Sequence, residues 1–347
     1  MDQDRLNDLR ARYGGSTSEA EAKDPLFRRI FAEQFSGGNR RIWPFTGVPT
    51  LLSAPLCADW RVADPKPEVA LVGVPMDLGV TNRAGSRLGP RAIRNIERMG
   101  PYEPGLHMAP MTEAHVADIG DVPMASRFSL DSCHADIERY FGELHAAGIR
   151  TVAAGGDHSV SLPILKALGR GRPLGMVHID AHADTSGQYE GTRFHHGGPF
   201  REAVLAGVLD PARTVQIGIR GGAGYLWEFS TESGMTLIQM HEVAATGIEA
   251  VIAKARQVAT GPVYVSFDID AIDPGFAPGT GTPEVGGLAP REVQQILRGL
   301  DGLDVVGGDV VEVAPQYDAS TATAQIGAQM MLHILCLLLR APSFRKG

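Results

Sequence analysis

The sequence places histidine and aspartate side chains at three points where an apolar run of residues ends. They are His158 in AAGGDHS, Asp180, His182 and Asp184 in VHIDAHADT, and Asp268 and Asp270 in VSFDIDAIDP. In an extended segment, side chains two residues apart point to the same face, so the members of each group should converge. Imidazole and carboxylate together suit divalent ions such as Mn²⁺. The pattern therefore predicts a metal site.

The expected charge of this cluster indicates how many ions it holds. Four converging aspartates repel one another, and at least one takes up a proton unless cations are present. Two divalent ions would balance the four negative charges. A pair of ions about 3.5–4 Å apart can share one water and lower its pKa towards neutrality, which supplies a nucleophile for hydrolysis. Two nearby acids are expected to do structural work: Asp157 should cap the helix that follows it, and Asp273 should fix a turn.

These side chains need a scaffold that brings the ends of several strands together. From residue 68 onward, short apolar runs alternate with amphipathic stretches. We expect strands at 69–75, 149–156, 173–180, 214–220, 235–240, 262–270 and 303–313, with helices at 129–148, 161–169, 248–260 and 290–300. Apolar strands separated by helices indicate a parallel sheet covered on both faces. Ligands of such sheets bind beyond the carboxyl ends of the strands, where the cluster lies.

Composition excludes several classes of function. The chain has 347 residues, 44% hydrophobic residues and a net charge of −8, so it lacks the basic surface expected of a nucleic-acid-binding protein. The longest apolar stretch, Met330 to Leu339, is about half a membrane span and predicts a buried helix. Three scattered cysteines and a start unlike a signal peptide indicate reduced thiols and a cytoplasmic location. Residues 1–60 are expected to form an arm that packs on the body or on a neighbouring subunit, and residues 61–347 a single catalytic domain.

Taken together, GGDHS, DAHAD and SFDIDAIDP resemble the signature motifs of the ureohydrolase family. This family includes arginase, agmatinase and guanidino-acid hydrolases, and the chain is most similar to its guanidinopropionase and guanidinobutyrase branch. The resemblance implies a three-layer αβα fold of the arginase/deacetylase type, with a mostly parallel eight-stranded sheet. It also implies a trimer or hexamer, which could include a paralogous subunit.

The same resemblance implies roles for individual residues. One ion would be held by His158, Asp180, Asp184 and Asp268, and the other by His182, Asp180, Asp268 and Asp270. His196, in HHGGP, resembles the proton-shuttling histidine of the family, and the adjacent His195 competes for that role. Glu312, in VVEVAP, resembles the carboxylate that binds the guanidinium. A fixed carboxylate suits the N–H groups of a guanidinium, and a histidine can protonate the departing amine.

We therefore expect an amidinohydrolase that cleaves a small guanidine to urea and an amine, with two divalent ions, Mn²⁺ favoured over Ni²⁺. The favoured substrates are guanidino acids such as guanidinopropionate or guanidinobutyrate, with Arg83 as a candidate partner of the carboxylate; a structural salt bridge is its alternative role. Ser186 stands where arginases have an asparagine-containing turn, which disfavours L-arginine. The aromatic side chain of Trp227 could instead close a small pocket around free guanidine, a methylated guanidine or a biguanide.

Two other functions are compatible with the motifs. A deacetylase on the same fold would use a single zinc ion, but His158 and Asp270 provide ligands for a second ion. A non-catalytic subunit of a mixed oligomer is the other alternative, although none of the six expected ligands is missing.

Overall fold

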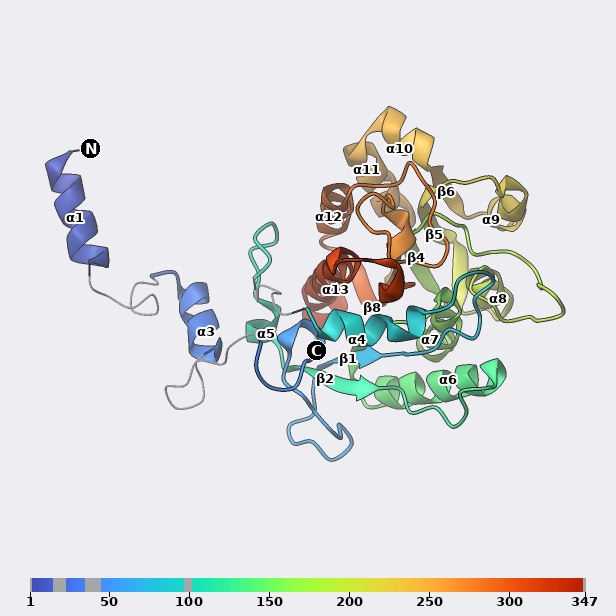
Figure 1. Cartoon of the computed structure of the whole chain (residues 1–347), viewed down its shortest axis with the longest axis horizontal. Coiled ribbons are helices and arrows are strands. Elements are labelled where there is room, and N and C mark those ends of the chain that lie inside the picture. The colour runs from blue at the N-terminus through green and yellow to red at the C-terminus, as the bar shows by residue number, and fades with distance from the viewer. Residues whose placement is uncertain (1, 15–22, 35–44, 97–101, 346–347) are drawn as a thin grey trace.

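A computed structural model describes residues 2–14, 23–34, 45–96 and 102–345. Within these residues, eight strands form one sheet in the order β2-β1-β3-β8-β7-β4-β5-β6, and all neighbouring strands are parallel (Figure 1). The strands are β1 Val69–Gly73, β2 Val116–Asp121, β3 Arg150–Ala154, β4 Leu174–Ile179, β5 Leu209–Ile219, β6 Thr236–Gln239, β7 Pro262–Asp268 and β8 Asp304–Val311.

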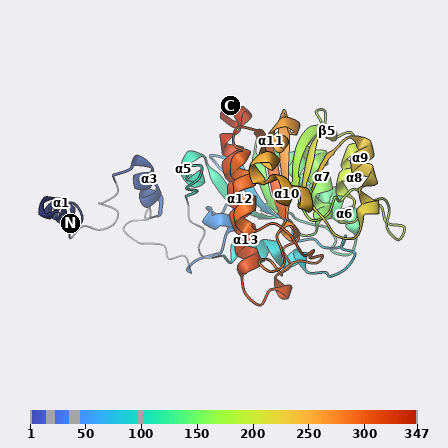
Figure 2. The same cartoon turned by 90° about the horizontal axis from the view of Figure 1, so that it is seen from above.

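Helices cover both faces of the sheet, and Figure 2 shows the sheet between the two helical layers. One apolar core lies between the sheet and α4 (Gly89–Arg94), α11 (Ile248–Val258), α12 (Pro290–Gly299) and α13 (Ala322–Arg340). The other lies between the sheet and α6 (Leu130–Ala146), α7 (Ser161–Leu168) and α8 (Pro199–Leu205). The other α-helices within the described residues are α1 Gln3–Tyr13, α3 Pro25–Gln34, α5 Pro110–Glu113, α9 Glu228–Ser233, α10 Met240–Thr246 and α14 Pro342–Arg345. The predicted three-layer αβα fold is confirmed.

The longest described helix, α13, contains the stretch Met330 to Leu339 that was predicted to be buried. Every residue from Met330 to Leu339 is buried against the sheet and the neighbouring helices. By length and composition α13 could cross a membrane, but 78% of its apolar window is buried inside the molecule. It is the central helix of one core.

Strand β2 was not predicted, because Asp118 and Gly120 interrupt its apolar pattern. The structure shows why an acid is tolerated there. Asp118 is fully buried and accepts hydrogen bonds from Arg94 Nε and from the backbone N–H of Leu51, each at 2.8 Å. A paired buried charge of this kind leaves no unmet hydrogen-bonding demand in the sheet.

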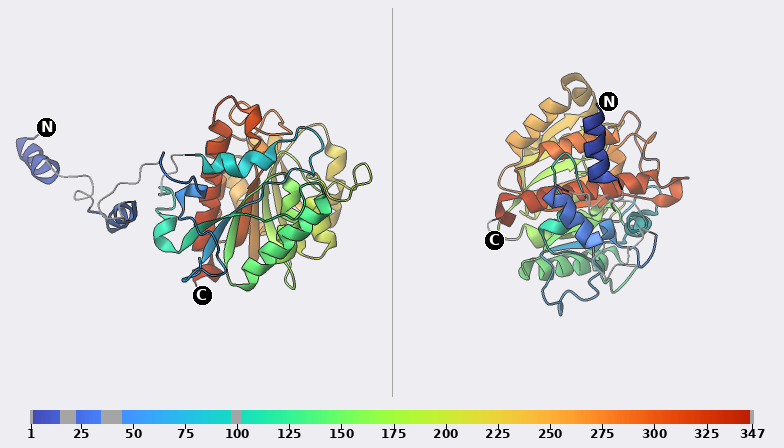
Figure 3. Two further views of the ribbon diagram at one scale, coloured as in Figure 1. Left: turned by 60° about the horizontal axis from the view of Figure 1, so that its bottom comes forward. Right: turned by 90° about the vertical axis from the view of Figure 1, so that its left-hand side faces the viewer.

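Within residues 1–60, the expected arm, the described helices project from the body, whereas the last residues are buried in it. Helices α1 and α3 project from one side of the body (Figure 3), with α3 between α1 and α5. Helix α1 has no buried residue, whereas α3 contacts the body through Arg29, which pairs with Glu113 at 3.3 Å. Leu51 and Trp60, by contrast, are buried in the two cores, so the end of this segment is part of the body.

Candidate metal centre

The candidate ligands lie at the carboxyl ends of three strands, β3, β7 and β4, in the middle of the sheet. Because β8 pairs with both β3 and β7, and β7 also pairs with β4, the four ends lie side by side. His158 follows β3, Asp180, His182 and Asp184 follow β4, and Asp268 and Asp270 end or follow β7. Glu312 directly follows β8, the strand between β3 and β7.

The first group of ligands surrounds one nitrogen. His158 Nδ1 lies 3.1 Å from an oxygen of Asp180, 2.9 Å from one of Asp184 and 3.2 Å from one of Asp268. All four side chains are almost fully buried. Separations near 3 Å are those expected between atoms that share a coordination sphere with metal–ligand distances of about 2.0–2.2 Å.

The second group shares Asp180 with the first. His182 Nδ1 lies 3.1 Å from Asp270 Oδ2 and 3.6 Å from Asp180 Oδ1. Asp268 joins the two groups, because its other oxygen accepts the backbone N–H of Asp270 at 2.8 Å. All six residues singled out from the sequence are therefore brought together.

The donor set fits divalent cations. His158 Nδ1 is buried and has no hydrogen-bond partner within the described chain, while its Nε2 contacts Ser266 Oγ at 2.9 Å. Burial raises the pKa of Asp268 well above its ordinary value, and the charges of Asp270 and Asp180 raise it further. Burial opposes protonation of His158, yet the surrounding carboxylates raise its pKa well above the ordinary value. The site thus favours positive charge between these side chains.

The predicted convergence is present, but the expected extended geometry is not its cause. Strand β4 ends at Ile179, and Asp184 has a left-handed backbone with φ of 51°. Asp270 lies in a 3₁₀ turn, Ile269–Ala271, which is capped by the side chain of Asp268. The side chains converge because the backbone bends after each strand.

A buried histidine within β4 orients one of the shared carboxylates. His178 Nε2 lies 2.7 Å from Asp180 Oδ2, and its Nδ1 lies 3.0 Å from the amide nitrogen of Gln216. An amide nitrogen can only donate, so Nδ1 is the acceptor and Nε2 carries the proton. Although its position would suit a ligand, His178 therefore donates to Asp180 and positions it.

A second buried network fixes the ring of His158. Ser266 Oγ donates to Asp309 Oδ1 at 2.7 Å and so accepts the N–H of His158. The other oxygen of Asp309 accepts from Tyr264 at 2.8 Å and Ser161 at 2.6 Å. This arrangement keeps Nδ1 directed at the carboxylates, a common role for groups behind a metal ligand. Sequence reasoning missed these residues, although each polar side chain interrupts an apolar, buried strand or helix.

A cavity of about 220 Å³ opens next to the ligands and is lined by Asp184, Asp268, Asp270 and His196, among others. His196 Nδ1 lies 2.9 Å from Glu312 Oε1, and its Nε2 lies 2.7 Å from Thr81 Oγ1. Burial opposes protonation of His196, but the hydrogen bond and charge of Glu312 outweigh it and raise its pKa to about 9. The backbone N–H of Thr81 also points at Nε2, at 3.1 Å, so Nε2 is an acceptor and Nδ1 is the nitrogen that donates to Glu312.

Glu312 is 2% exposed and has one oxygen in use and one without a partner. Oε1 accepts from the backbone N–H of His158 at 2.9 Å as well as facing His196, whereas Oε2 has no hydrogen-bond partner among the described residues. Its backbone is left-handed, with φ of 62°. Such a conformation is costly for a non-glycine residue and persists only where the surrounding structure holds it.

The two acids expected to be structural have such contacts. Asp157 accepts the N–H of Ser159 at 2.9 Å and so caps the turn that leads into α7. Asp273 accepts backbone N–H groups from a glycine on its own side of the turn and from two facing glycines, at 2.7–3.1 Å. Both expectations are confirmed.

Of the three residues predicted to contact the substrate, two line this cavity and one does not. Ser186 and Trp227 line the 220 Å³ cavity, as does His195, whose Nε2 donates to the carbonyl of Gly187 at 2.7 Å. Arg83 is not among the lining residues. Its guanidinium donates to the carbonyl oxygens of Thr280 and Gly281 at 2.7 and 3.1 Å, and it stacks on Tyr317.

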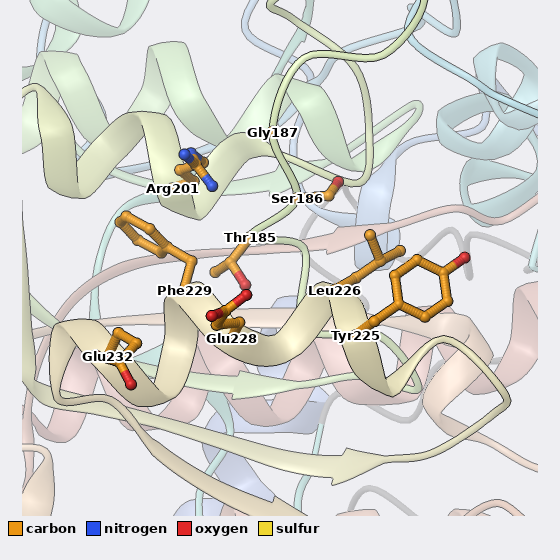
Figure 4. A pocket seen from close by; sticks show the side chains of 9 residues that line it. All are labelled: Thr185, Ser186, Gly187, Arg201, Tyr225, Leu226, Glu228, Phe229 and Glu232. Carbon is orange, nitrogen blue, oxygen red and sulfur yellow. The ribbon is translucent and has the colours of Figure 1, made fainter.

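A second cavity of about 330 Å³ adjoins the first and shares Thr185, Ser186 and Leu226 with it. Figure 4 shows Arg201 and Glu228 approaching from opposite sides of Thr185, with Phe229 and Glu232 beside them. Sequence reasoning gave no role to Arg201 or to these acids.

Comparison with known proteins agrees with this arrangement. Residues 67–337 match the model of the arginase family. The chain is 50% identical over 299 residues to a guanidinopropionase of Pseudomonas aeruginosa, covering 85% of this chain and 92% of that protein. It is 43% identical to a mitochondrial agmatinase of Gallus gallus, covering 84% and 86%. Proclavaminate amidino hydrolase from Streptomyces clavuligerus has a similar structure, with a TM-score of 0.81, 33% identity, and 86% and 99% of the two chains covered.

These relatives confirm the predicted resemblance to ureohydrolases and the predicted enzyme class, a hydrolase of C–N bonds in linear amidines. The family match spans the whole sheet, from β1 to β8, and most of α13. The chain belongs to the arginase family.

Proposed function

We propose that the chain hydrolyses a small guanidino acid, such as guanidinopropionate or guanidinobutyrate, to urea and an amino acid, and that it uses two divalent ions. The observation that carries this proposal is the pairing of a buried carboxylate-rich cluster with Glu312, whose Oε2 has no partner among the described residues. The identity to a guanidinopropionase supports the choice of substrate class.

The resemblance to the family assigns the ligands of each metal ion, and the two groups of contacts are compatible with that assignment. His158, Asp180, Asp184 and Asp268 would hold one ion, and His182, Asp180, Asp268 and Asp270 the other. When bound, the two ions supply the Lewis acidity that makes a hydroxide nucleophile available near neutral pH. Mn²⁺ suits the carboxylate-rich donor set, and Ni²⁺ is the alternative because intrinsic affinity rises towards it.

The chain's own residues would bind the substrate and move a proton. Glu312 offers Oε2 to the N–H groups of the guanidinium, which remains charged at neutral pH. His196 lines the cavity, and its Nδ1 donates to Glu312, which raises the pKa of the ring to about 9. It can therefore give a proton to the departing amine nitrogen, which would otherwise leave as an unstable anion.

Free guanidine, a methylated guanidine or a biguanide is the second candidate substrate. Leu226 and Trp227 line the same cavity as the ligands, and an aromatic face can stack on a planar cation. A substrate without a tail would need no anchor beyond the cavity. For this reason the substrate panel below includes compounds with and without a carboxylate.

We also propose that the chain acts in the cytoplasm as a homotrimer or homohexamer. The three cysteines are unpaired, and two of them are buried, which is compatible with a reducing compartment. If it were a non-catalytic partner subunit instead, the chain expressed alone would release no urea even when loaded with metal.

The test is a urea-release screen with the chain expressed alone and loaded with Mn²⁺ or Ni²⁺. We expect urea from guanidinopropionate or guanidinobutyrate and close to two ions per chain by elemental analysis. Tailless guanidines cleaved faster than guanidino acids would favour the second candidate. A single bound ion, with no urea from any guanidine, would instead favour the deacetylase alternative.

A further inference from the structure

The second cavity contains an arginine that no residue in the described chain neutralises. Arg201, on α8, lies half-buried over the ring of Phe229, with its guanidinium carbon 4.8 Å from the ring centre. Gly187 lies next to it, since a Cβ at this position would be 3.8 Å from Arg201 Nη1, in ordinary van der Waals contact. Stacking fixes the plane of the guanidinium and leaves its N–H groups available.

The other arginines near the two cavities are occupied. Arg83 donates to two backbone carbonyls, and Arg193 pairs with Glu202 at 2.5 Å. Arg220 donates to the carbonyl oxygens of Asp270 and Glu284, both at 2.7 Å. Within the described residues, Arg201 is thus the arginine beside the cavities with no hydrogen-bond acceptor or ion pair.

We propose that Arg201 binds the carboxylate of the substrate's tail while the guanidinium lies in the adjacent cavity at the metal centre. This inference rests on the proposed function. The two cavities share the wall formed by Thr185, Ser186 and Leu226, so a ligand that fills the inner cavity can extend into the outer one. Thr185 Oγ1 bonds to Ser230 Oγ at 2.8 Å, which ties this wall to the start of α9.

Two glutamates of α9 add negative charge to the second, outer cavity. Glu228 and Glu232 line it and are exposed, so water and salt weaken their charges. Arg201 is less exposed, and its charge acts more strongly on a bound carboxylate. With Arg201 removed, the cavity keeps two acids and no cation. A tail that carries an ammonium group should then bind better than one that carries a carboxylate.

The test compares steady-state kinetics of the metal-loaded wild type and Arg201→Gln. The substrates are 4-guanidinobutyrate, agmatine and n-butylguanidine, which have tails of similar length and negative, positive and no charge. We expect KM for guanidinobutyrate to rise by about 10–100-fold, as for the loss of a charge-assisted hydrogen bond. KM for butylguanidine should stay within about 2-fold, and the preference for guanidinobutyrate over agmatine should fall or reverse.

Arg193→Gln is the matched control, because Arg193 already pairs with Glu202 and lines neither cavity. It should leave all three KM values unchanged. The inference is overturned if Arg201→Gln changes the three substrates alike or not at all while the wild type still releases urea.

A binding measurement separates this inference from the proposed function. Calorimetric titration of 4-aminobutyrate, the product amino acid, into metal-loaded protein needs no turnover. If the wild type released no urea but bound this amino acid in an Arg201-dependent way, the reaction would be wrong and the carboxylate site would stand. If Arg201→Gln bound it as well as the wild type, the carboxylate site would be wrong.

Discussion

Both carboxylate oxygens of Asp270 make contacts at the candidate metal centre. Its Oδ2 lies 3.1 Å from His182 Nδ1 and accepts from Thr282, while Oδ1 accepts the backbone N–H of Ala181 at 3.1 Å. We expect Asp270→Asn to lose one ion per chain and to lower urea release by at least about 100-fold, because the second ion is needed to activate the nucleophile. Elemental analysis and a urea assay on the same sample test both effects.

The matched control for Asp270 is Asp273, three residues along the chain. The side chain of Asp273 accepts hydrogen bonds from the N–H groups of three glycines and contacts none of the candidate ligands, so Asp273→Asn should keep both ions. It should cost on the order of 1 kcal/mol of stability, as is usual for one weakened hydrogen-bond acceptor. Two ions in purified Asp270→Asn would contradict the assignment.

His196 and His195 are neighbours with different expected roles. His196→Ala should retain both ions but lower kcat by roughly 10²–10⁴-fold, the usual contribution of a general acid. His195 bonds to the carbonyl of Gly187, so His195→Gln should lower kcat by less than about 10-fold. If the His195 variant lost more rate than the His196 variant, the proton-shuttling role would belong to His195.

Residue types and spacing at strand ends were enough to predict the six candidate ligands, whereas His196 and Glu312 were predicted from the resemblance to the family. The positioning residues His178 and Asp309 were missed because the strands that contain them were interpreted only as apolar runs. A polar side chain inside a strand that is buried on both faces is itself a signal, since it must have a partner. The sequence could not decide whether Arg83 or Arg201 binds the substrate carboxylate. Only the structure shows that Arg83 already donates its hydrogen bonds to backbone carbonyls, whereas Arg201 lies over the ring of Phe229.

At the scale of elements, β7, β8 and α7 are joined beneath the site by Asp309. Removing Ser266 would leave His158 Nε2 without its acceptor and Asp309 with one donor fewer. We expect Ser266→Ala to weaken metal affinity by about 10–100-fold, as is typical for a group that orients a metal-bound histidine. Affinity is measured by competition with a chelator.

Tyr264→Phe is the control at this scale. It removes a different donor from Asp309 and leaves the contact between Ser266 and His158 intact. It should lower the free energy of unfolding by about 1–2 kcal/mol but change metal affinity much less. Equal losses of affinity in the two variants would mean that the network only stabilises the fold.

Seven of the eight described strands were predicted, because parallel strands buried on both faces are continuous apolar runs. Strand β2 lies at the edge of the sheet and tolerates Asp118 through its pairing with Arg94, a contact between distant segments. Strand β5 begins five residues earlier than the predicted start at 214, at Leu209, where polar residues conceal it. Periodicity cannot reveal either feature.

At the scale of the whole molecule, α1 is the longest of the described helices that has no buried residue. An isolated helix of 11 residues is only marginally stable in water, and the partly exposed Leu6 and Leu9 lie on one side of it. We expect α1 to pack on a neighbouring subunit. Deleting residues 2–14 should lower the mass of the oligomer in light scattering, while the thermal midpoint of the body changes by less than about 2 °C.

The double variant Leu6→Ser and Leu9→Ser removes the apolar side chains of α1 without shortening the chain. It should lower the mass of the oligomer as the deletion does. An oligomer of unchanged mass in both variants would show that α1 makes no contact between subunits.

The left-handed backbone at Asp184 and Glu312 lowers the stability of the fold at two residues of the candidate site. Each residue holds a conformation that glycine adopts freely, at a cost on the order of 1 kcal/mol or more. Selection of metal-free protein for heat resistance alone would therefore drift towards glycine at both positions. The selected variants would be more stable to heat but inactive. A library designed to raise the thermal stability of this enzyme should therefore leave these two codons unchanged.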